Sequence, residues 1–132
     1  MKKLSYACKE GKFKKVKKYL KKGKDPNESD TQNCTPLHLA CKSKEGFKEI
    51  AELLIKHGAN VNYLDEDNVT PFNGAVRLNR ANIVKTFFEL GTNLDLNIRN
   101  DYGNTAFEDT FGSRKRFGNV GKLMIYQDHI KN

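Results

Sequence analysis

Two cysteines and a histidine lie close together in the sequence and carry the atoms that bind zinc. Cys34, His38 and Cys41 would supply two sulfurs and one nitrogen. A structural zinc site takes four ligands in paired spacings, however, and this segment offers three ligands and no Cys-x-x-Cys pair. We therefore predict no metal site and no cofactor. We expect all three cysteines, Cys8 included, to be small buried hydrophobic side chains in a reducing compartment.

Motifs for catalysis are missing from the sequence. The chain contains no Gly-x-Ser-x-Gly elbow, no Gly-rich phosphate loop and no His-Glu-x-x-His motif. No pair of carboxylates is placed in a plausible cleft. The sequence therefore predicts that the protein is not an enzyme and has no small-molecule substrate.

A run of lysines near the N-terminus has the chemistry to bind anions. Residues 1–24 hold eleven Lys and one acidic residue, a balance of 11 − 1 = +10, whereas residues 25–132 hold 13 basic and 15 acidic residues, a balance of 13 − 15 = −2. Any function based on net charge therefore belongs to one end of the chain. If Val16 and Leu20 face inward on a helix, its outer face is covered by Lys14, Lys15, Lys17, Lys18, Lys21 and Lys22.

The elements that position these residues follow from an internal period. Thr35, Thr70 and Thr105 are spaced by 35 and again by 35 residues, and Pro follows the first two. A Thr side chain accepts a hydrogen bond at the start of a helix, and Pro suits the first helical position. The pattern predicts a short helix after each Thr, the first of them from Pro36 to about Ser43.

A second recurring signal predicts a longer helix in each unit. The segments 20–23, 55–58 and 88–91 each end in Gly and are soon followed by Asn. Between Phe47 and His57, apolar residues recur at helical spacing, and Gly58 is a typical left-handed helix end. The polar residues 59–67 predict a hairpin-like extended loop. Because neither helix is long enough to be stable alone, the units must stack.

In these residues the chain resembles the ankyrin repeat family. The stretches Cys34–Cys41 (CTPLHLAC) and Leu54–Asn62 (LIKHGANVN) are nearly identical to the family pattern. The resemblance implies a mainly α solenoid of four helix-turn-helix units with hairpin-like loops, in a single domain spanning 1–132. We expect repeat 1 at 1–29, repeat 2 at 30–64, repeat 3 at 65–99 and repeat 4 at 100–132, the first and last being caps.

The sequence departs from the family pattern at several positions. Repeat 3 has Asn68 in place of a Gly and Asn73 in place of the family's structural His, which in repeat 2 is His38. Repeat 4 lacks the Pro and becomes irregular from residue 112. The resemblance implies that His38 hydrogen-bonds near the helix start and packs against the next repeat, and is not a catalytic base. Asn62 resembles ankyrin asparagines that are hydroxylated, a modification and not a function.

The resemblance also implies a function, because ankyrin repeats usually bind a partner protein through a concave face of hairpin tips and first helices. Val69, Leu78 and Tyr102 would be exposed apolar side chains on that face, and we expect at least one of them to contact the partner, since aromatic residues often dominate binding. By motif position the face comprises Thr31, Gln32, Cys34, Lys42 and Ser43 in repeat 2; Glu66, Asp67, Val69, Arg77 and Leu78 in repeat 3; and Asp101, Tyr102 and Asn104 in repeat 4.

The lysine-covered helix supports an alternative function, a basic module that docks on nucleic acid or anionic membrane. Neutralised phosphates release counterions, which favours such binding. Against it, aromatic residues are not interleaved among the lysines, and the end of a repeat array must be polar in any case. The lysines are therefore either a solvated end surface or this docking surface.

The setting of the protein is expected to be intracellular. No apolar run approaches the ~18 residues of a transmembrane helix, and Lys9 and Glu10 interrupt any signal peptide. We expect a cytoplasmic monomer. Abundant Lys, Asn and Ile favour an AT-rich genome, which suits a host-directed regulator of a virus or bacterium. The identity of the partner protein does not follow from the sequence.

Overall fold

The computed structural model describes residues 1–43, 47–91 and 93–112, and for 110–112 the backbone alone. These ranges contain seven helices and no strand. The helices form three pairs and a single helix. They are α1 (Lys3–Lys9) with α2 (Phe13–Lys21), α3 (Pro36–Lys42) with α4 (Lys48–Lys56), α5 (Pro71–Arg77) with α6 (Ala81–Leu90), and α7 (Ala106–Gly112).

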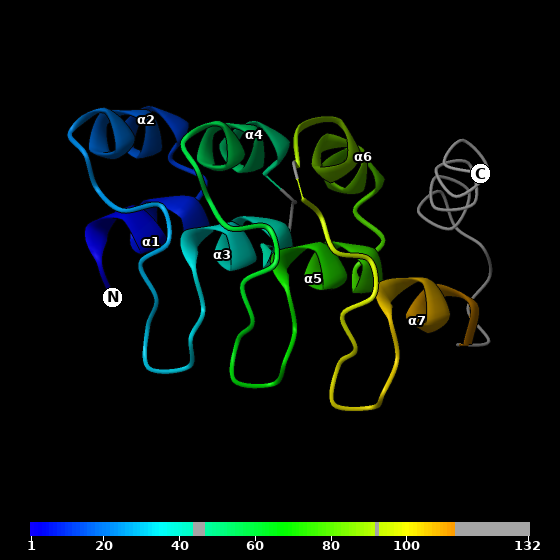
Figure 1. Cartoon of the computed structure of the whole chain (residues 1–132). Helices are drawn as coiled ribbons and strands as arrows, with labels where there is room; N and C mark the ends of the chain where they lie inside the picture. Colours follow the sequence, from blue (N-terminus) through cyan, green and yellow to red (C-terminus); the bar gives the residue numbers. More distant parts are fainter. Residues whose placement is uncertain (44–46, 92, 113–132) are drawn as a thin grey trace.

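The helices lie in two layers (Figure 1). α1, α3, α5 and α7 stand side by side in one layer, α2, α4 and α6 form the second, and hairpin-like loops project from the first layer on the side away from the second. The predicted helical solenoid is confirmed. The irregular part of repeat 4 lies outside the described residues, apart from its first residue. Within the described ranges, no helix combines the length and the apolar character that crossing a membrane requires.

Threonines begin the first helices as predicted. The Thr35 and Thr70 hydroxyl oxygens accept hydrogen bonds of 3.4 and 3.0 Å from backbone N–H groups in the first turns of α3 and α5. Thr105 does the same before α7, at 3.2 Å. These bonds satisfy N–H donors that would otherwise be unpaired at the start of a helix. Thr therefore recurs every 35 residues because a first helix begins every 35 residues.

The glycines that follow the second helices adopt two different backbone conformations. Gly23 and Gly58 take left-handed φ angles of 86° and 91° after α2 and α4, as predicted. After α6, Gly91 has a φ of −79°, and Asn93 takes the left-handed conformation at 64°. A Cβ at Gly91 would lie 2.5 Å from the Phe87 carbonyl oxygen, so glycine is required there for space and not for a positive φ.

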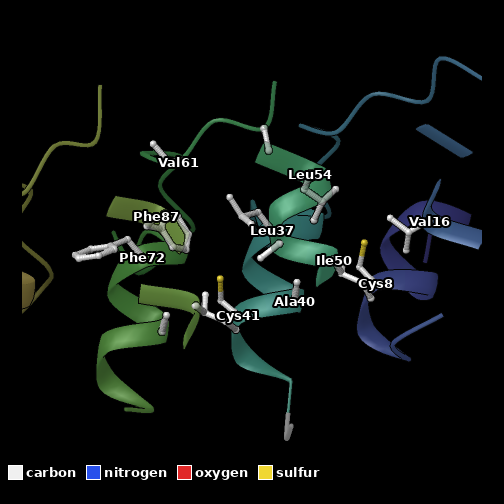
Figure 2. Packing of buried hydrophobic residues seen from close by; sticks show 14 of the residues in the cluster. Cys8, Val16, Leu37, Ala40, Cys41, Ile50, Leu54, Val61, Phe72 and Phe87 are labelled. Carbon is white, nitrogen blue, oxygen red and sulfur yellow. The ribbon is translucent and has the colours of Figure 1, made fainter. Parts of the chain in front are cut away.

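The core runs through the stack without a break between repeats. Figure 2 shows Leu37, Ala40 and Cys41 of α3 among side chains from the repeats on both sides. From the neighbouring repeats these are Cys8 and Val16 on one side and Phe72 and Phe87 on the other, and Ile50 and Leu54 of α4 pack in the same cluster. Cys8 and Cys41 are fully buried as expected, but Cys34 is only partly buried because it belongs to a hairpin-like loop.

Candidate functional site

Each hairpin-like loop is held in shape by the side chain at its start. The Oδ1 atom of this residue accepts hydrogen bonds of 2.8–3.1 Å from the backbone N–H groups two and four residues later. The three residues are Asp30, Asp65 and Asn100, again at a spacing of 35. A residue with left-handed φ follows in each loop: Asn33 at 58°, Asn68 at 59° and Gly103 at 80°. Asn68 thus replaces the glycine of the family pattern at little cost, because Asn tolerates this conformation.

Asp65 is also part of an ion pair that reaches the preceding repeat. Its Oδ2 atom lies 3.3 Å from Nζ of Lys42, at the end of α3. Burial alone would raise the pKa of the Asp65 carboxyl. The N–H groups of Val69 and Asp67 together with Lys42 outweigh burial and hold that pKa below its ordinary value. Asp65 is therefore a charged carboxylate that joins its own hairpin-like loop to the preceding repeat.

Neighbouring hairpins are joined at their tips. The backbone N–H of Glu66 donates a 2.9 Å hydrogen bond to the carbonyl oxygen of Gln32. Asn68 Nδ2 donates a 2.9 Å bond to the Asp101 carboxylate. The three hairpins therefore form one continuous surface.

A groove opens between the hairpin-like loops that begin at Asp65 and Asn100 and the helices α3 and α5. Its volume is about 510 Å³, and we call it the groove throughout. The residues that line it are Lys42, Asp65, Asp67, Val69, Gly74, Arg77, Leu78, Asn100, Asp101 and Tyr102. Seven of the thirteen residues predicted for partner binding are among them: Lys42, Asp67, Val69, Arg77, Leu78, Asp101 and Tyr102.

The end of the groove near α7 is organised around Arg77. Its Nε atom lies 3.6 Å from the Asp109 carboxylate, and its guanidinium group lies 5.9 Å from the centre of the Tyr102 ring. Asn100 Nδ2 donates a 2.7 Å hydrogen bond to the same carboxylate oxygen of Asp109. Tyr102 nevertheless remains 80% exposed, and Leu78 is 44% exposed. The Arg77 side chain is thus oriented by Asp109, while the neighbouring Tyr102 ring remains open to solvent.

The structure corrects the expectation for Val69, whose side chain is only 6% exposed. Its backbone N–H donates to Asp65, and its carbonyl oxygen accepts a bond from His38, so both peptide groups are fixed against the stack. Val69 contributes to the floor of the groove but is not an exposed apolar contact.

The remaining predicted residues lie outside the groove. Thr31, Gln32 and Glu66 are exposed on the hairpins, whereas Cys34, Ser43 and Asn104 are partly buried. Ser43 Oγ donates to the Ala40 carbonyl oxygen and so completes the end of α3. The groove residues that sequence reasoning missed as site residues are Asp65, Gly74 and Asn100. The 35-residue spacing of Asp30, Asp65 and Asn100 was the available signal for two of them.

His38 is engaged at both ring nitrogens. The Thr35 backbone N–H donates to Nδ1 at 3.1 Å, which assigns the proton to Nε2, and Nε2 donates to the Val69 carbonyl oxygen at 2.9 Å. Burial lowers the pKa of this imidazole. The predicted structural role of His38 is confirmed, since its ring links the start of α3 to the next repeat.

The buried thiols have the character of packing residues. Burial raises the pKa of the Cys8 thiol to about 12, and burial also raises the pKa of Cys41. Thiolates are the reactive form of cysteine, so both side chains are poor nucleophiles and poor metal ligands. Within the described ranges, no three His, Cys, Asp or Glu side chains gather to hold a metal ion.

Comparison with known proteins identifies the repeat. The family model for ankyrin repeats (3 copies) matches residues 4–106. The ankyrin repeat protein FPV222 of fowlpox virus is 34% identical over 118 residues, which are 89% of this chain and 15% of that protein. A second fowlpox virus ankyrin repeat protein, FPV244, is 29% identical over 83% of this chain and 16% of its own length.

A fission yeast protein gives a similar match. The ankyrin repeat-containing protein P1E11.10 of Schizosaccharomyces pombe is 29% identical over 74% of this chain and 44% of its own length. The chain thus spans less than half the length of each of these relatives. Repeats of this family generally mediate protein–protein interaction. From its helix pairs, its hairpin geometry and the family match, the chain belongs to the ankyrin repeat family.

Proposed function

We propose that this protein is a non-catalytic interaction module that binds a partner protein in the groove of repeats 2 to 4. The observation that carries the proposal is Tyr102, an aromatic ring 80% exposed at the edge of the groove. Tyr and Arg are the residue types that most often dominate the energy of a protein interface, and Arg77 lies directly beside Tyr102.

The arrangement of Arg77 lowers the entropic cost of binding. Because Asp109 and the Tyr102 ring hold the Arg77 side chain before any partner arrives, few rotamers are lost on association. The exposed side chain of Leu78 adds an apolar contact in the same groove. Together the three side chains form a small contact surface in which Arg77 is already oriented.

Charge supports a specific kind of partner segment. Lys42 is paired with Asp65, and Arg77 with Asp109. Glu66, Asp67 and Asp101, by contrast, are exposed and have no ion pair with any described residue. Uncompensated carboxylates at the hairpin tips favour a partner segment with Lys or Arg beside an apolar side chain.

The composition and the relatives extend the proposal to a biological setting. Two of the similar ankyrin proteins come from fowlpox virus. We propose that the protein acts on proteins of a host cell, as a regulator of viral or bacterial origin. The partner protein itself is to be found by experiment.

Affinity capture from cell lysate tests the proposal. Wild-type protein is compared with Tyr102→Ala, with nuclease present to remove nucleic acid and with bound proteins identified by mass spectrometry. A specific partner should be retained by the wild type and lost in the variant, and in a direct titration the loss should be about 30-fold or more, the size of a binding hot spot.

An exposed aromatic residue away from the groove provides the matched control. Tyr6 of α1 is 49% exposed, and Tyr6→Ala should keep the partner. A partner that binds wild type and Tyr102→Ala equally well would place the interface outside the groove. Both variants change exposed side chains, so circular dichroism should show unchanged folding.

A further inference from the structure

The outer face of α2 carries an uncompensated positive charge. Five lysines of α2 and its C-cap residue Lys22 are all exposed, and none of the six forms an ion pair with a described residue. We call Lys14, Lys15, Lys17, Lys18, Lys21 and Lys22 the lysine face. Neither α2 nor its cap residues include an acidic side chain.

The corresponding helices of the next two repeats are neutralised. On α4, Lys48 pairs with Glu52 at 3.4 Å, and on α6, Lys85 pairs with Glu89 at 3.8 Å, both one helical turn apart. The need for a polar outer surface is thus met by mixed charges in repeats 2 and 3. Solubility alone therefore does not explain why repeat 1 carries charges of one sign.

The lysine face also destabilises α2, the helix that carries it. Lys14 and Lys18 stand four residues apart, as do Lys17 and Lys21, and like charges at this spacing destabilise a helix. Nearby anionic groups would relieve the repulsion. A polyanionic partner therefore stabilises the helix that it binds.

The make-up of the face favours one kind of polyanion. Val16 and Leu20 are buried in the stack, so α2 has no free apolar face to enter the acyl region of a membrane. Of the two aromatic residues of α2, Tyr19 packs against the core, and only Phe13, 40% exposed at the first position, is open to solvent. The face therefore offers no row of rings on which successive single-stranded bases could stack. Lysines alone suit the phosphates of a duplex.

We propose that the lysine face binds the phosphate backbone of a double-stranded nucleic acid without regard to sequence. The face extends from Lys14 to Lys22, roughly 12 Å along the helix. Lys18 lies opposite the buried Val16 and Leu20, and Lys14 and Lys21 lie one helical turn before and after Lys18, so these three form the centre of the face. Because α2 lies in the layer away from the hairpins, a bound duplex leaves the groove free (Figure 1).

Fluorescence anisotropy with a labelled DNA duplex of about 20 base pairs tests the proposal. With about three phosphates neutralised, the slope of log K against log salt is about −2.7, so raising salt from ~100 to ~200 mM weakens binding about sixfold. The variant Lys14→Gln/Lys18→Gln/Lys21→Gln should bind about tenfold more weakly or worse. A duplex of different sequence should bind equally well.

The matched control removes the same charge from the neighbouring helices. Lys48→Gln/Lys56→Gln/Lys85→Gln lowers the net charge by three on α4 and α6 and should retain nearly all binding. If the two variants lose the same amount of duplex affinity, binding depends on the net charge of the protein and not on the lysine face, and the proposal is overturned. Absence of duplex binding, or tighter binding to vesicles with ~30% phosphatidylserine, would overturn the proposal as well. None of these outcomes involves the groove, which is tested separately through Tyr102.

Discussion

The junction between repeats 2 and 3 and the junction between repeats 3 and 4 pack corresponding helices but differ in the side chain at the position of His38 and Asn73. At the first, the His38 ring bonds to Thr35 in its own repeat and to the Val69 carbonyl oxygen in the next. At the second, Asn73 occupies the same position, and its buried Oδ1 atom has no hydrogen-bond partner among the described residues. The two junctions share their apolar packing but not this polar link.

The difference separates two contributions to the stability of a stack. Apolar packing continues from α3 through α5 to α7, whereas the buried ring couples only α3 to the repeat that follows. A buried oxygen without a partner costs stability, since it has lost its bonds to water. Repeat 4 should therefore separate from the stack more easily than repeat 3.

The largest effect should come from breaking the packing that both junctions need. Leu54 is fully buried on α4, which packs against α2, α3 and α6. Leu54→Ala should lower the free energy of unfolding by about 2–5 kcal/mol, measured by urea denaturation. Leu64→Ala, at a 42% exposed position, is the control and should cost less than about 0.5 kcal/mol. A loss below about 1 kcal/mol at Leu54 would refute its place in the core.

The next effect should come from making the first junction like the second. His38→Asn removes the ring that joins Thr35 to Val69 and leaves the Thr35 N–H without its acceptor. We expect a loss of about 2 kcal/mol in urea denaturation. His57→Asn, at an exposed helix end, should cost less than about 1 kcal/mol. Equal losses at His38 and His57 would show that the link contributes nothing.

The reverse change should strengthen the second junction. Asn73→His should place a donor near the Asn104 carbonyl oxygen, since Asn73 and Asn104 have the same separation as His38 and Val69. We expect a gain of about 1 kcal/mol. Asn73→Ala removes the unpaired oxygen without adding a link, so it separates the two contributions. If the His variant is no more stable than the Ala variant, the link has not formed.

The smallest effect should be a pH dependence confined to the first junction. Burial lowers the pKa of His38 in the folded protein, so below about pH 6.5 the unfolded chain binds a proton that the folded chain does not. Stability should fall as the pH drops from about 6.5 toward the folded pKa and should not change above pH 7 on account of this group. The difference in unfolding free energy between wild type and His38→Asn should shrink over that window. A constant difference would contradict the burial of a neutral ring.

Much of the fold was accessible from local sequence signals. Thr35 and Thr70 mark helix starts, and Gly58 marks a helix end, because each acts on the backbone within a few residues of its own position. Gly91 shows the limit of such reasoning. Gly91 follows α6 as Gly58 follows α4, but glycine is needed at Gly91 because a Cβ would clash with Phe87, and not because φ is positive.

The site was less accessible because it depends on contacts between repeats. Tyr102, Arg77 and Asp109 come from two repeats, and their meeting depends on how far one repeat is displaced from the next. Val69 is likewise buried at a contact between repeats, where its carbonyl oxygen accepts a bond from His38, 31 residues earlier. Motif position identified most of the groove residues but not which side chains fill it and which remain free.

Asparagines at the helix-end loops suggest how the array can grow. Asn27 donates to Gly58 and accepts from Asn60, 31 and 33 residues later. Asn62 repeats both bonds, to Asn93 and Asp95, at the same separations. Repeat 2 therefore makes the same pair of hydrogen bonds with both of its neighbours, and a second copy of repeat 2 inserted in register would find its donors and acceptors already matched. Gene duplication can lengthen such a chain without first inventing a new contact.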